Sequence, residues 1–261
     1  MKLIDKLWNW GHLEGSHNSI TCLQCSMSPE GFAEKYGVRR SFIVSYSGNI
    51  QPPFQGLAAR FSPLAEVKWS VLGDSSTPLP AHRLGFAPEI IACAKQYPNI
   101  TGGIVDDFFS PERKKRFPPE VLREIRAELN GAGLDFWCVL YDHELDQQDL
   151  PAYLDCFDGV TFWLWGCEKI GRLDDLLAKF YALIGNKPNM LGVYLWDYKD
   201  VGKQPMEPAL FDAQLTKYFG MLRDKKTGGV VFCSNTVGDA DLPTNRLLAQ
   251  RIEEYGGIEI E

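Results

Sequence analysis

The chain has 261 residues, of which 45% are hydrophobic and 23% charged, and its formal net charge is −7. This composition supplies enough apolar surface for a large core and excludes an intrinsically disordered chain. The acidic balance, and the lack of an apolar stretch near the roughly 18 residues that span a bilayer, argue against nucleic acid or a membrane as a partner.

The first 18 residues precede the first predicted strand, so we interpret 1–18 as an N-terminal extension. Charges at Lys2, Asp5 and Lys6 interrupt the apolar run that a signal peptide needs. The seven cysteines are scattered through apolar segments, which favours reduced thiols and a cytoplasmic protein. A secreted protein that has lost its leader would show the same pattern.

Cys22 and Cys25 form a C-x-x-C motif within a predicted strand over 19–27. Residues three apart on a strand face opposite sides, so the two thiols cannot share one metal ion there. No second pair exists to complete a site. We predict two ordinary buried cysteines, and we expect neither a metal nor a cofactor.

Eight apolar runs follow one another along the chain, each ending in polar or aromatic residues. Near-continuous apolar character is typical of strands that are buried on both faces. The predicted strands are 19–27, 41–47, 66–72, 100–108, 134–142, 157–165, 190–198 and 228–236.

Helical patterns fill several of the gaps between these runs, most clearly over 117–131, 171–186, 208–224 and 243–257. Eight alternations of strand and helix in 261 residues predict an α/β fold, a (β/α)8 TIM barrel that forms a single domain over 1–261. An open doubly wound sheet is the alternative. That fold favours a glycine-rich phosphate turn, and neither G-x-G-x-x-G nor G-x-x-x-x-G-K-[ST] is present.

Active sites of such barrels lie at the carboxyl ends of the strands, and strand alternation sorts the side chains that face inward. Aromatic rings interleaved with polar groups gather there. They suit a carbohydrate, whose flat C–H faces stack on rings and whose hydroxyl groups form hydrogen bonds. The predicted substrate-binding residues are Tyr141, Asp142, His143, Trp163, Trp165, Tyr194, Trp196 and Asn235.

The stretch GGIVDDFF (102–109) gives the strongest chemical signal, because two adjacent carboxylates end a buried strand and are costly there unless used. Alternation makes Asp107 the inward acid and Asp106 its neighbour. A glycoside hydrolase needs two carboxyl groups, one of which stays protonated in apolar surroundings. The predicted partner of Asp107 is Glu144 or Asp197; a capping acid and a turn residue are the structural interpretations of these two.

The strand order, the Gly103–Asp107 ending (GIVDD) of the fourth predicted strand and the aromatic-rich sixth and seventh resemble the large superfamily of (β/α)8 glycoside hydrolases. Members commonly carry a catalytic acid at the end of the fourth strand, so the resemblance implies a glycosidase of carbohydrate metabolism. The chain departs from the commonest pattern. It has no Asn-Glu pair ending the fourth strand, no glutamate ending the seventh, and no D-x-x-D-x-D-x-E run of chitinase-like barrels.

Two other functions remain open. A barrel that has lost catalysis would bind glycans through the same aromatic mouth. A metal-dependent sugar isomerase or hydrolase would use Asp107, His143, Glu144 and Asp197 as ligands, since carboxylates and imidazole are common metal ligands. No pattern in the sequence indicates an oligomeric state.

Overall fold

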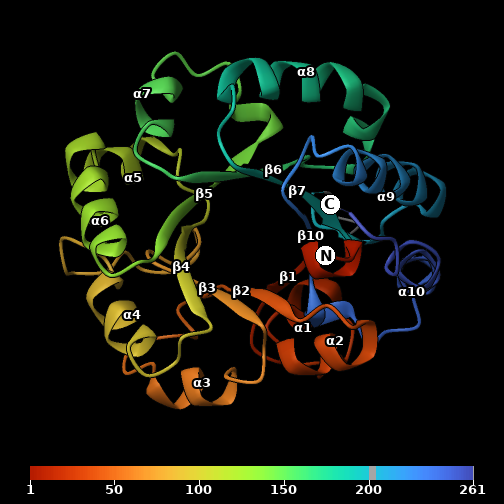
Figure 1. Ribbon diagram of the computed structural model, residues 1–261, viewed down its shortest axis with the longest axis horizontal. Coiled ribbons are helices and arrows are strands. Elements are labelled where there is room, and N and C mark those ends of the chain that lie inside the picture. Colours follow the sequence, from red (N-terminus) through yellow and green to blue (C-terminus); the bar gives the residue numbers. More distant parts are fainter. Residues whose placement is uncertain (200–203, 261) are drawn as a thin grey trace.

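The computed structural model describes residues 1–199 and 204–260. Eight strands close into a barrel, and neighbours around the ring pair in parallel (Figure 1). The predicted (β/α)8 barrel is confirmed, and the open-sheet alternative is wrong. In ring order the strands are β1 (Leu7–Gly11), β10 (Val230–Cys233), β7 (Asn189–Tyr194), β6 (Gly159–Trp163), β5 (Asp135–Tyr141), β4 (Ile100–Val105), β3 (Glu66–Ser70) and β2 (Arg40–Ile43).

Helices surround the barrel, and α6 (Pro119–Gly131), α8 (Leu173–Ile184), α9 (Pro208–Arg223) and α10 (Pro243–Tyr255) confirm the four helical patterns (Figure 1). Pro119 fits the first turn of α6, and its buried residues lie at helical spacing from Val121 to Leu129. The other helices are α1 (Asn18–Thr21), α2 (Pro29–Tyr36), α3 (Gln55–Arg60), α4 (Ala87–Ala94), α5 (Pro111–Arg116) and α7 (Leu150–Leu154), with 3-10 turns η1 (Leu3–Lys6), η2 (Asp142–Glu144), η3 (Cys167–Arg172) and η4 (Asn235–Val237).

The first strand lies earlier in the chain than predicted, so the interpretation of 1–18 as an extension before it is wrong. β1 falls inside that segment and pairs with β2 and β10, which closes the ring. All five of its residues are buried. The polar Asn9 interrupts the apolar run, but its side chain bonds Ser41 and Asn235 and is therefore compatible with a fully buried strand.

The run 19–27, predicted as a strand, is instead the end of α1 and a loop. The Asn18 side chain both donates to the carbonyl oxygen of Cys25 and accepts from its backbone N–H, each at 3.1 Å. These two bonds fold the segment back on itself, because they satisfy backbone groups that a sheet would otherwise pair. Both thiols are free; Cys25 is buried as predicted, whereas Cys22 is exposed.

Tryptophans fill the barrel, and glycines on neighbouring strands make room for them. A Cβ atom on Gly159 would lie 2.5 Å from the ring of Trp137, and one on Gly192 would collide with the ring of Trp163. Trp163 also packs against Trp10 of β1, with ring centroids 5.3 Å apart. The interior is therefore a packed core with no spare volume at these positions.

We expect Gly192→Ala to destabilise the protein by about 2–3 kcal/mol, because an added methyl group must displace the Trp163 ring from a packed interior. Urea denaturation measures the change. The matched control is Gly220→Ala in α9, where a Cβ meets nothing within 4 Å; that change should stabilise the helix by about 0.5–1 kcal/mol. Equal effects of the two variants would contradict the packing argument.

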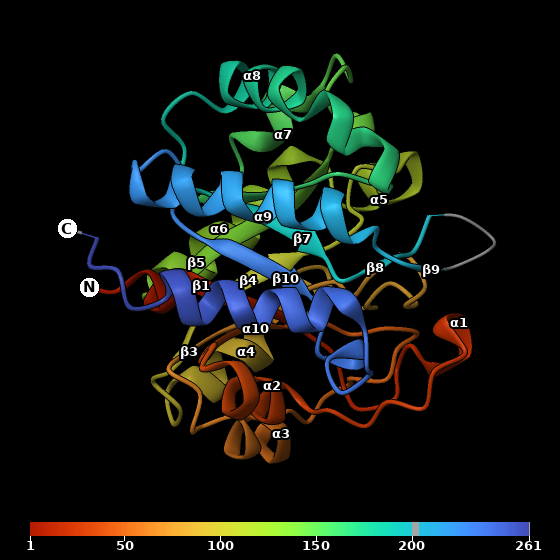
Figure 2. The ribbon, with the colours of Figure 1, turned by 90° about the vertical axis from the view of Figure 1, so that its right-hand side faces the viewer.

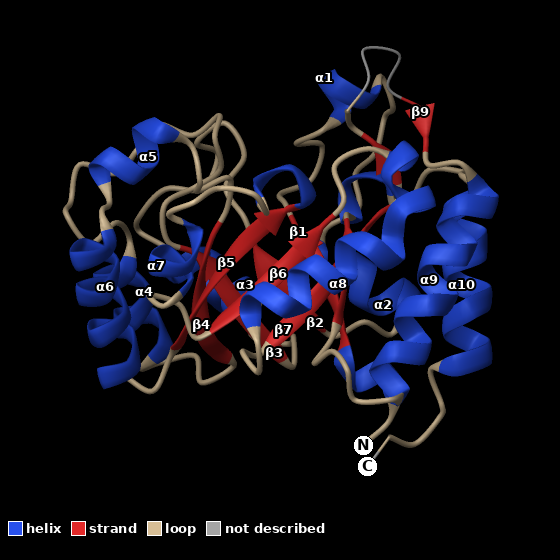
Figure 3. Ribbon diagram, turned by 90° about the horizontal axis from the view of Figure 1, so that it is seen from above, coloured by secondary structure: helices blue, strands red, loops and turns tan. Residues whose placement is uncertain are grey.

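The two ends of the barrel differ. Loops with α1, α5 and the small antiparallel pair β8 (Trp196–Asp197) and β9 (Gln204–Pro205) lie at the carboxyl ends of the strands, which we call the mouth (Figures 2 and 3). Met1 and Ile260 lie at the opposite end, the base, where the Ile260 N–H donates to the Met1 carbonyl oxygen at 2.8 Å. Within the described ranges, no helix has the length and apolar character that crossing a bilayer requires.

Candidate active site

Asp106 and Asp107 follow β4 at the mouth, and Asp106 is the more deeply buried, with 6% of its surface exposed. Asp107 is half-buried and has a left-handed backbone, with φ 47°. The Asp107 N–H donates to Asp106 Oδ1 at 2.9 Å. The left-handed Asp107 breaks the strand alternation from which we predicted that Asp107 faces inward and Asp106 flanks it, so this order stays a prediction.

Ser75 and Tyr141 also position the two carboxyl groups. The backbone N–H and the hydroxyl of Ser75 donate to Asp107 Oδ2 at 3.1 and 2.6 Å. The Tyr141 hydroxyl at the end of β5 lies 3.0 Å from Asp107 Oδ1 and 3.5 Å from Asp106 Oδ1. Asp107 is thus held from two sides by donors on different loops, which fixes its direction.

Burial raises the pKa of Asp106 well above its usual range, and the charges of Asp107 and Asp74 raise it further. The Arg113 guanidinium opposes this shift, but its hydrogen bonds go to the carbonyl oxygens of Gly73, Asp74 and Asp106 and not to a carboxylate. Arg113 therefore ties the β3 and β4 loops together, and the Asp106 carboxyl has no ion pair within the part of the chain that the structure describes.

Glu144, on the turn after β5, is buried, and burial raises the pKa of its carboxyl to about 7. The nearby charges of Asp107 and Asp142 also raise this pKa. Its Oε2 accepts from the Tyr141 N–H at 2.9 Å, so the capping role considered for this residue is present. The same carboxyl group lines a cavity and holds a proton near neutral pH.

Asp107 and Glu144 line one cavity of about 410 Å³ at the mouth, which is within the range of roughly 300–1,000 Å³ that small-molecule sites occupy. Three predicted binding residues, Tyr141, His143 and Trp165, form its aromatic wall. The His143 ring stacks on Tyr141 at 5.5 Å, and Trp165 meets Tyr141 edge-on at 5.7 Å. The other lining residues are Ser75, Phe109, Ser110 and Gln147.

Two further predicted residues support this wall without lining the cavity. Asp142 accepts from the Trp165 N–H at 2.7 Å and so holds the β6 loop beside β5. Tyr194, at the end of β7, lies edge-on to Trp165 at 5.9 Å and packs against Trp163 at 5.1 Å. Asp142 and Tyr194 therefore contribute to the cavity indirectly, because they hold Trp165 in place.

The remaining predicted site residues lie elsewhere. Trp163 belongs to the barrel core, with its indole N–H on Thr161 at 2.9 Å. Asn235 is fully buried and bonds the backbone of His12 and Met27. Trp196 is buried in the β8–β9 pair beyond the end of β7.

Asp197 has backbone partners, which matches its interpretation as a turn residue. It accepts from the backbone N–H of Cys167 at 3.2 Å and of Lys199 at 3.1 Å. It does not line the cavity of Asp107 and Glu144. Over residues 1–199 and 204–260, no three His, Cys, Asp or Glu side chains form a group that could hold a metal ion, so the four ligands of the metal-dependent alternative do not meet.

A histidine pair that was not predicted from the sequence lies at the mouth, next to β1. The rings of His12 and His17 are 4.4 Å apart, and His17 Nδ1 lies 2.8 Å from the Thr236 hydroxyl and 3.2 Å from that of Tyr198. Burial lowers the pKa of His17 to about 4 and that of His12 well below its usual value, so both are neutral at pH 7. His12 directly follows β1, so assigning that strand correctly would have placed it at the mouth.

No family model and no curated protein matches the sequence. Among solved structures, the spore cortex-lytic enzyme SleL of Bacillus megaterium QM B1551 is 12% identical with a TM-score of 0.63, over 100% of this chain and 76% of that one. A GH128 endo-β-1,3-glucanase of Amycolatopsis mediterranei, solved with laminarihexaose, is 10% identical with a TM-score of 0.54, over 94% and 99%. The tryptophan synthase α-subunit of Pyrococcus furiosus is 13% identical with a TM-score of 0.55, over 99% and 100%.

At these identities the likeness shows the fold. The chain shares the (β/α)8 barrel of glycoside hydrolases, which confirms the predicted resemblance at that level, and the tryptophan synthase subunit shares the barrel too. Any choice among barrel functions therefore depends on the residues at the mouth.

Proposed function

We propose that the protein is a glycoside hydrolase whose substrate binds in the mouth cavity between the β4 and β5 loops. The observation that carries the proposal is the pairing of Asp107 and Glu144 in one cavity with an aromatic wall. Glycosidic hydrolysis needs two such carboxyl groups, of which one must hold a proton. A pKa of about 7 suits Glu144 to that role at neutral pH.

In this proposal, Glu144 donates its proton to the leaving glycosidic oxygen while Asp107 acts on the opposite side of the anomeric carbon. Asp107 either attacks that carbon or activates a water molecule. The donors on Asp107, from Ser75 and Tyr141, keep its carboxylate oriented. Trp165, Tyr141 and His143 offer faces on which a sugar ring can stack.

The cavity favours an uncharged sugar over an acidic one. Its described lining contains two carboxyl groups and no lysine or arginine. Lys114, whose charge acts on Glu144, is already paired with Asp149 at 2.7 Å. A uronic acid would therefore meet repulsion from Asp107, and no lysine or arginine of the described lining compensates it. β-1,3-Glucan, the class bound by the GH128 neighbour, is a suitable first substrate because it is neutral.

The pH profile tests the assignment of Glu144. A general acid works only while protonated, so we expect kcat/KM to fall about tenfold per pH unit above pH ~7. Release of reducing ends from laminarin and from a spore-cortex preparation, measured between pH 4 and pH 9, gives the profile. A rate that stays constant up to pH 9 would contradict the assignment.

A glycan-binding barrel without turnover is the second candidate. It is favoured by the chain's lack of a glutamate ending β7, where the commonest retaining arrangement has one. The aromatic wall would serve that function equally well. Saturable binding of laminarin with no release of reducing ends at any pH would establish it and reject the hydrolase.

A further inference from the structure

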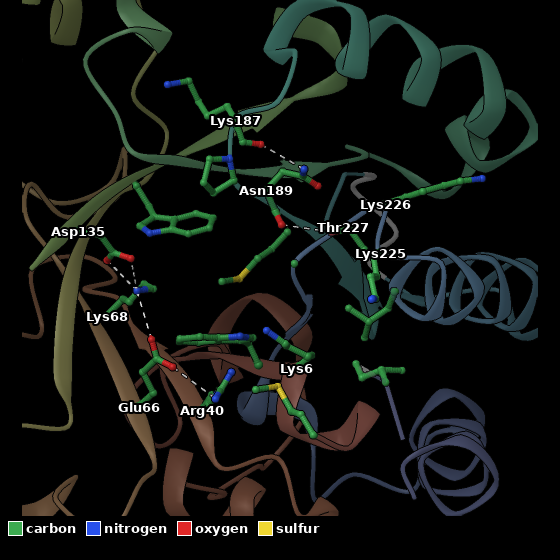
Figure 4. A pocket seen from close by; sticks show the side chains of 18 of the residues that line it. Lys6, Arg40, Glu66, Lys68, Asp135, Lys187, Asn189, Lys225, Lys226 and Thr227 are labelled. Carbon is green, nitrogen blue, oxygen red and sulfur yellow. Dashed lines mark hydrogen bonds and ion pairs between the residues drawn. The ribbon is translucent and has the colours of Figure 1, made fainter. Parts of the chain in front are cut away.

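A second and larger cavity, of about 750 Å³, lies at the base of the barrel (Figure 4). The amino ends of the strands and the segment after α9 form its walls, so it faces away from the mouth. Two acidic side chains line it, together with six basic ones: Lys6, Arg40, Lys68, Lys187, Lys225 and Lys226. This basic excess contrasts with the chain's net charge of −7.

The acidic residues are already paired, and they neutralise one wall of the cavity. Lys68 is 2% exposed and bonds both oxygens of Asp135, at 2.7 and 2.8 Å. Glu66 lies 3.4 Å from both Lys68 and Arg40. This chain of four charges sums to zero and closes the barrel floor (Figure 4). A structural role is enough to explain these four charges, since buried charges need partners of opposite sign.

The remaining four basic side chains form what we call the basic wall of the cavity: Lys6, Lys187, Lys225 and Lys226. Among residues 1–199 and 204–260, no carboxylate lies within 4 Å of the ammonium groups of Lys6, Lys187 or Lys225. Lys187 donates to the carbonyl oxygen of Phe157 at 2.7 Å, which leaves its charge uncompensated. Figure 4 shows Lys225 across the cavity from Asp135 and Lys68, and Lys6 beside Arg40.

Lys225 occupies a backbone position that normally belongs to glycine. It follows the C-cap of α9 with φ 59°, in the left-handed region. Its N–H bonds Leu222 O at 3.1 Å and the next N–H bonds Met221 O at 2.9 Å, the two hydrogen bonds of a Schellman motif. A lysine here strains the backbone. Residues that break a local rule often serve a function, and this side chain puts a cation on the cavity wall.

We propose that the base cavity binds a small, multiply charged anion of the phosphate class. Ammonium groups act as point charges that suit clustered phosphate oxygens. The basic wall carries four lysines, Lys6, Lys187, Lys225 and Lys226. Their one carboxylate neighbour among the described residues is Asp224, 4.0 Å from Lys226. The volume exceeds that of a single phosphate and accommodates a diphosphate or a larger phosphorylated molecule. This site is independent of the proposed hydrolase.

Isothermal titration of the full chain with inorganic pyrophosphate, in buffer of low ionic strength, tests the proposal. We expect saturable binding of one pyrophosphate per chain, which weakens as salt is added. Citrate, a carboxylate anion of similar charge, should bind at least tenfold more weakly. The absence of binding at low salt, or equal affinities for the two anions, would overturn the proposal.

Lys225→Gly is the decisive variant because it should weaken pyrophosphate binding and at the same time stabilise the fold. Glycine removes the cation and relaxes the left-handed residue, so pyrophosphate affinity should fall about tenfold while Tm rises by about 1–3 °C. Lower affinity with higher stability cannot come from unfolding. Lys6→Gln should weaken binding similarly. Unchanged affinity in both variants would reject the site.

Lys95→Ala is the matched control, since Lys95 is exposed after α4 and does not line the cavity. It should leave pyrophosphate affinity unchanged. An equal loss in Lys95→Ala would show that the anion responds to overall charge, and would overturn a defined site.

Discussion

We expect Asp107→Asn to lower kcat on the glycan substrate by about 10³-fold and to leave substrate affinity within a few-fold of the original. The amide cannot act as nucleophile or base, and losing such a group typically costs 10²–10⁴-fold. The aromatic wall of Tyr141, His143 and Trp165 remains, so binding persists. Initial rates of reducing-end release, with Kd from titration of the variant, measure both effects.

Two controls make this result specific. Asp175→Asn, on the exposed face of α8, should leave kcat unchanged. Asp106→Asn should cost much less than Asp107→Asn, because the raised pKa of Asp106 keeps its carboxyl neutral and the amide has nearly the same shape. A larger loss in Asp106→Asn than in Asp107→Asn would move the catalytic role to Asp106 and reject our assignment.

Glu144→Gln has the second large expected effect, and its size depends on the leaving group. We expect a loss of about 10²–10⁴-fold for natural sugar leaving groups, which need protonation. A dinitrophenyl glycoside leaves without a proton and should lose much less. The fall in rate above pH ~7 should also disappear with the variant, because glutamine does not titrate. Equal losses on both substrates would contradict a general-acid role.

The stability of Glu144→Gln provides an independent check on the same carboxyl. The folded-state pKa of Glu144 is raised, so its ionisation opposes folding as pH rises through about 7. Glutamine still accepts from the Tyr141 N–H and carries no charge. The variant should therefore be more stable than the original protein at pH 8 and similar to it at pH 4. Thermal unfolding at the two pH values measures this difference.

Seven of the eight barrel strands overlap runs predicted from the sequence, because strands buried on both faces are apolar almost throughout. The first strand, β1, was not predicted because its sequence is not continuously apolar. Asn9 interrupts it, and its partners, Ser41 on β2 and Asn235 on η4, are far away in sequence. Conversely, the apolar run 19–27 is not a strand, because the Asn18 side chain bonds the Cys25 backbone and folds the segment back. The hydrophobic pattern does not predict these local hydrogen bonds.

At the candidate site, the residue types were predicted better than their directions. Asp107, Glu144, Tyr141, His143 and Trp165 do share a cavity. Strand alternation does not determine the directions of Asp106 and Asp107, since Asp107 is a left-handed residue beyond the strand end.

Glu144 and Asp197 illustrate the same limit. Each follows a strand at the mouth, and only the loop paths separate them: one carboxyl enters the cavity and the other bonds backbone N–H groups. Loop paths depend on contacts distant in sequence, and periodicity does not encode these.

The contact between the chain ends has a consequence for engineering. Met1 and Ile260 are hydrogen-bonded to each other at the base, and Lys2 bridges to Glu259 beside them. A short linker could therefore join the ends, and new termini could be opened in a surface loop, as circular permutation requires. A domain fused at either end would emerge beside the basic cavity and leave the mouth accessible to a polymeric glycan.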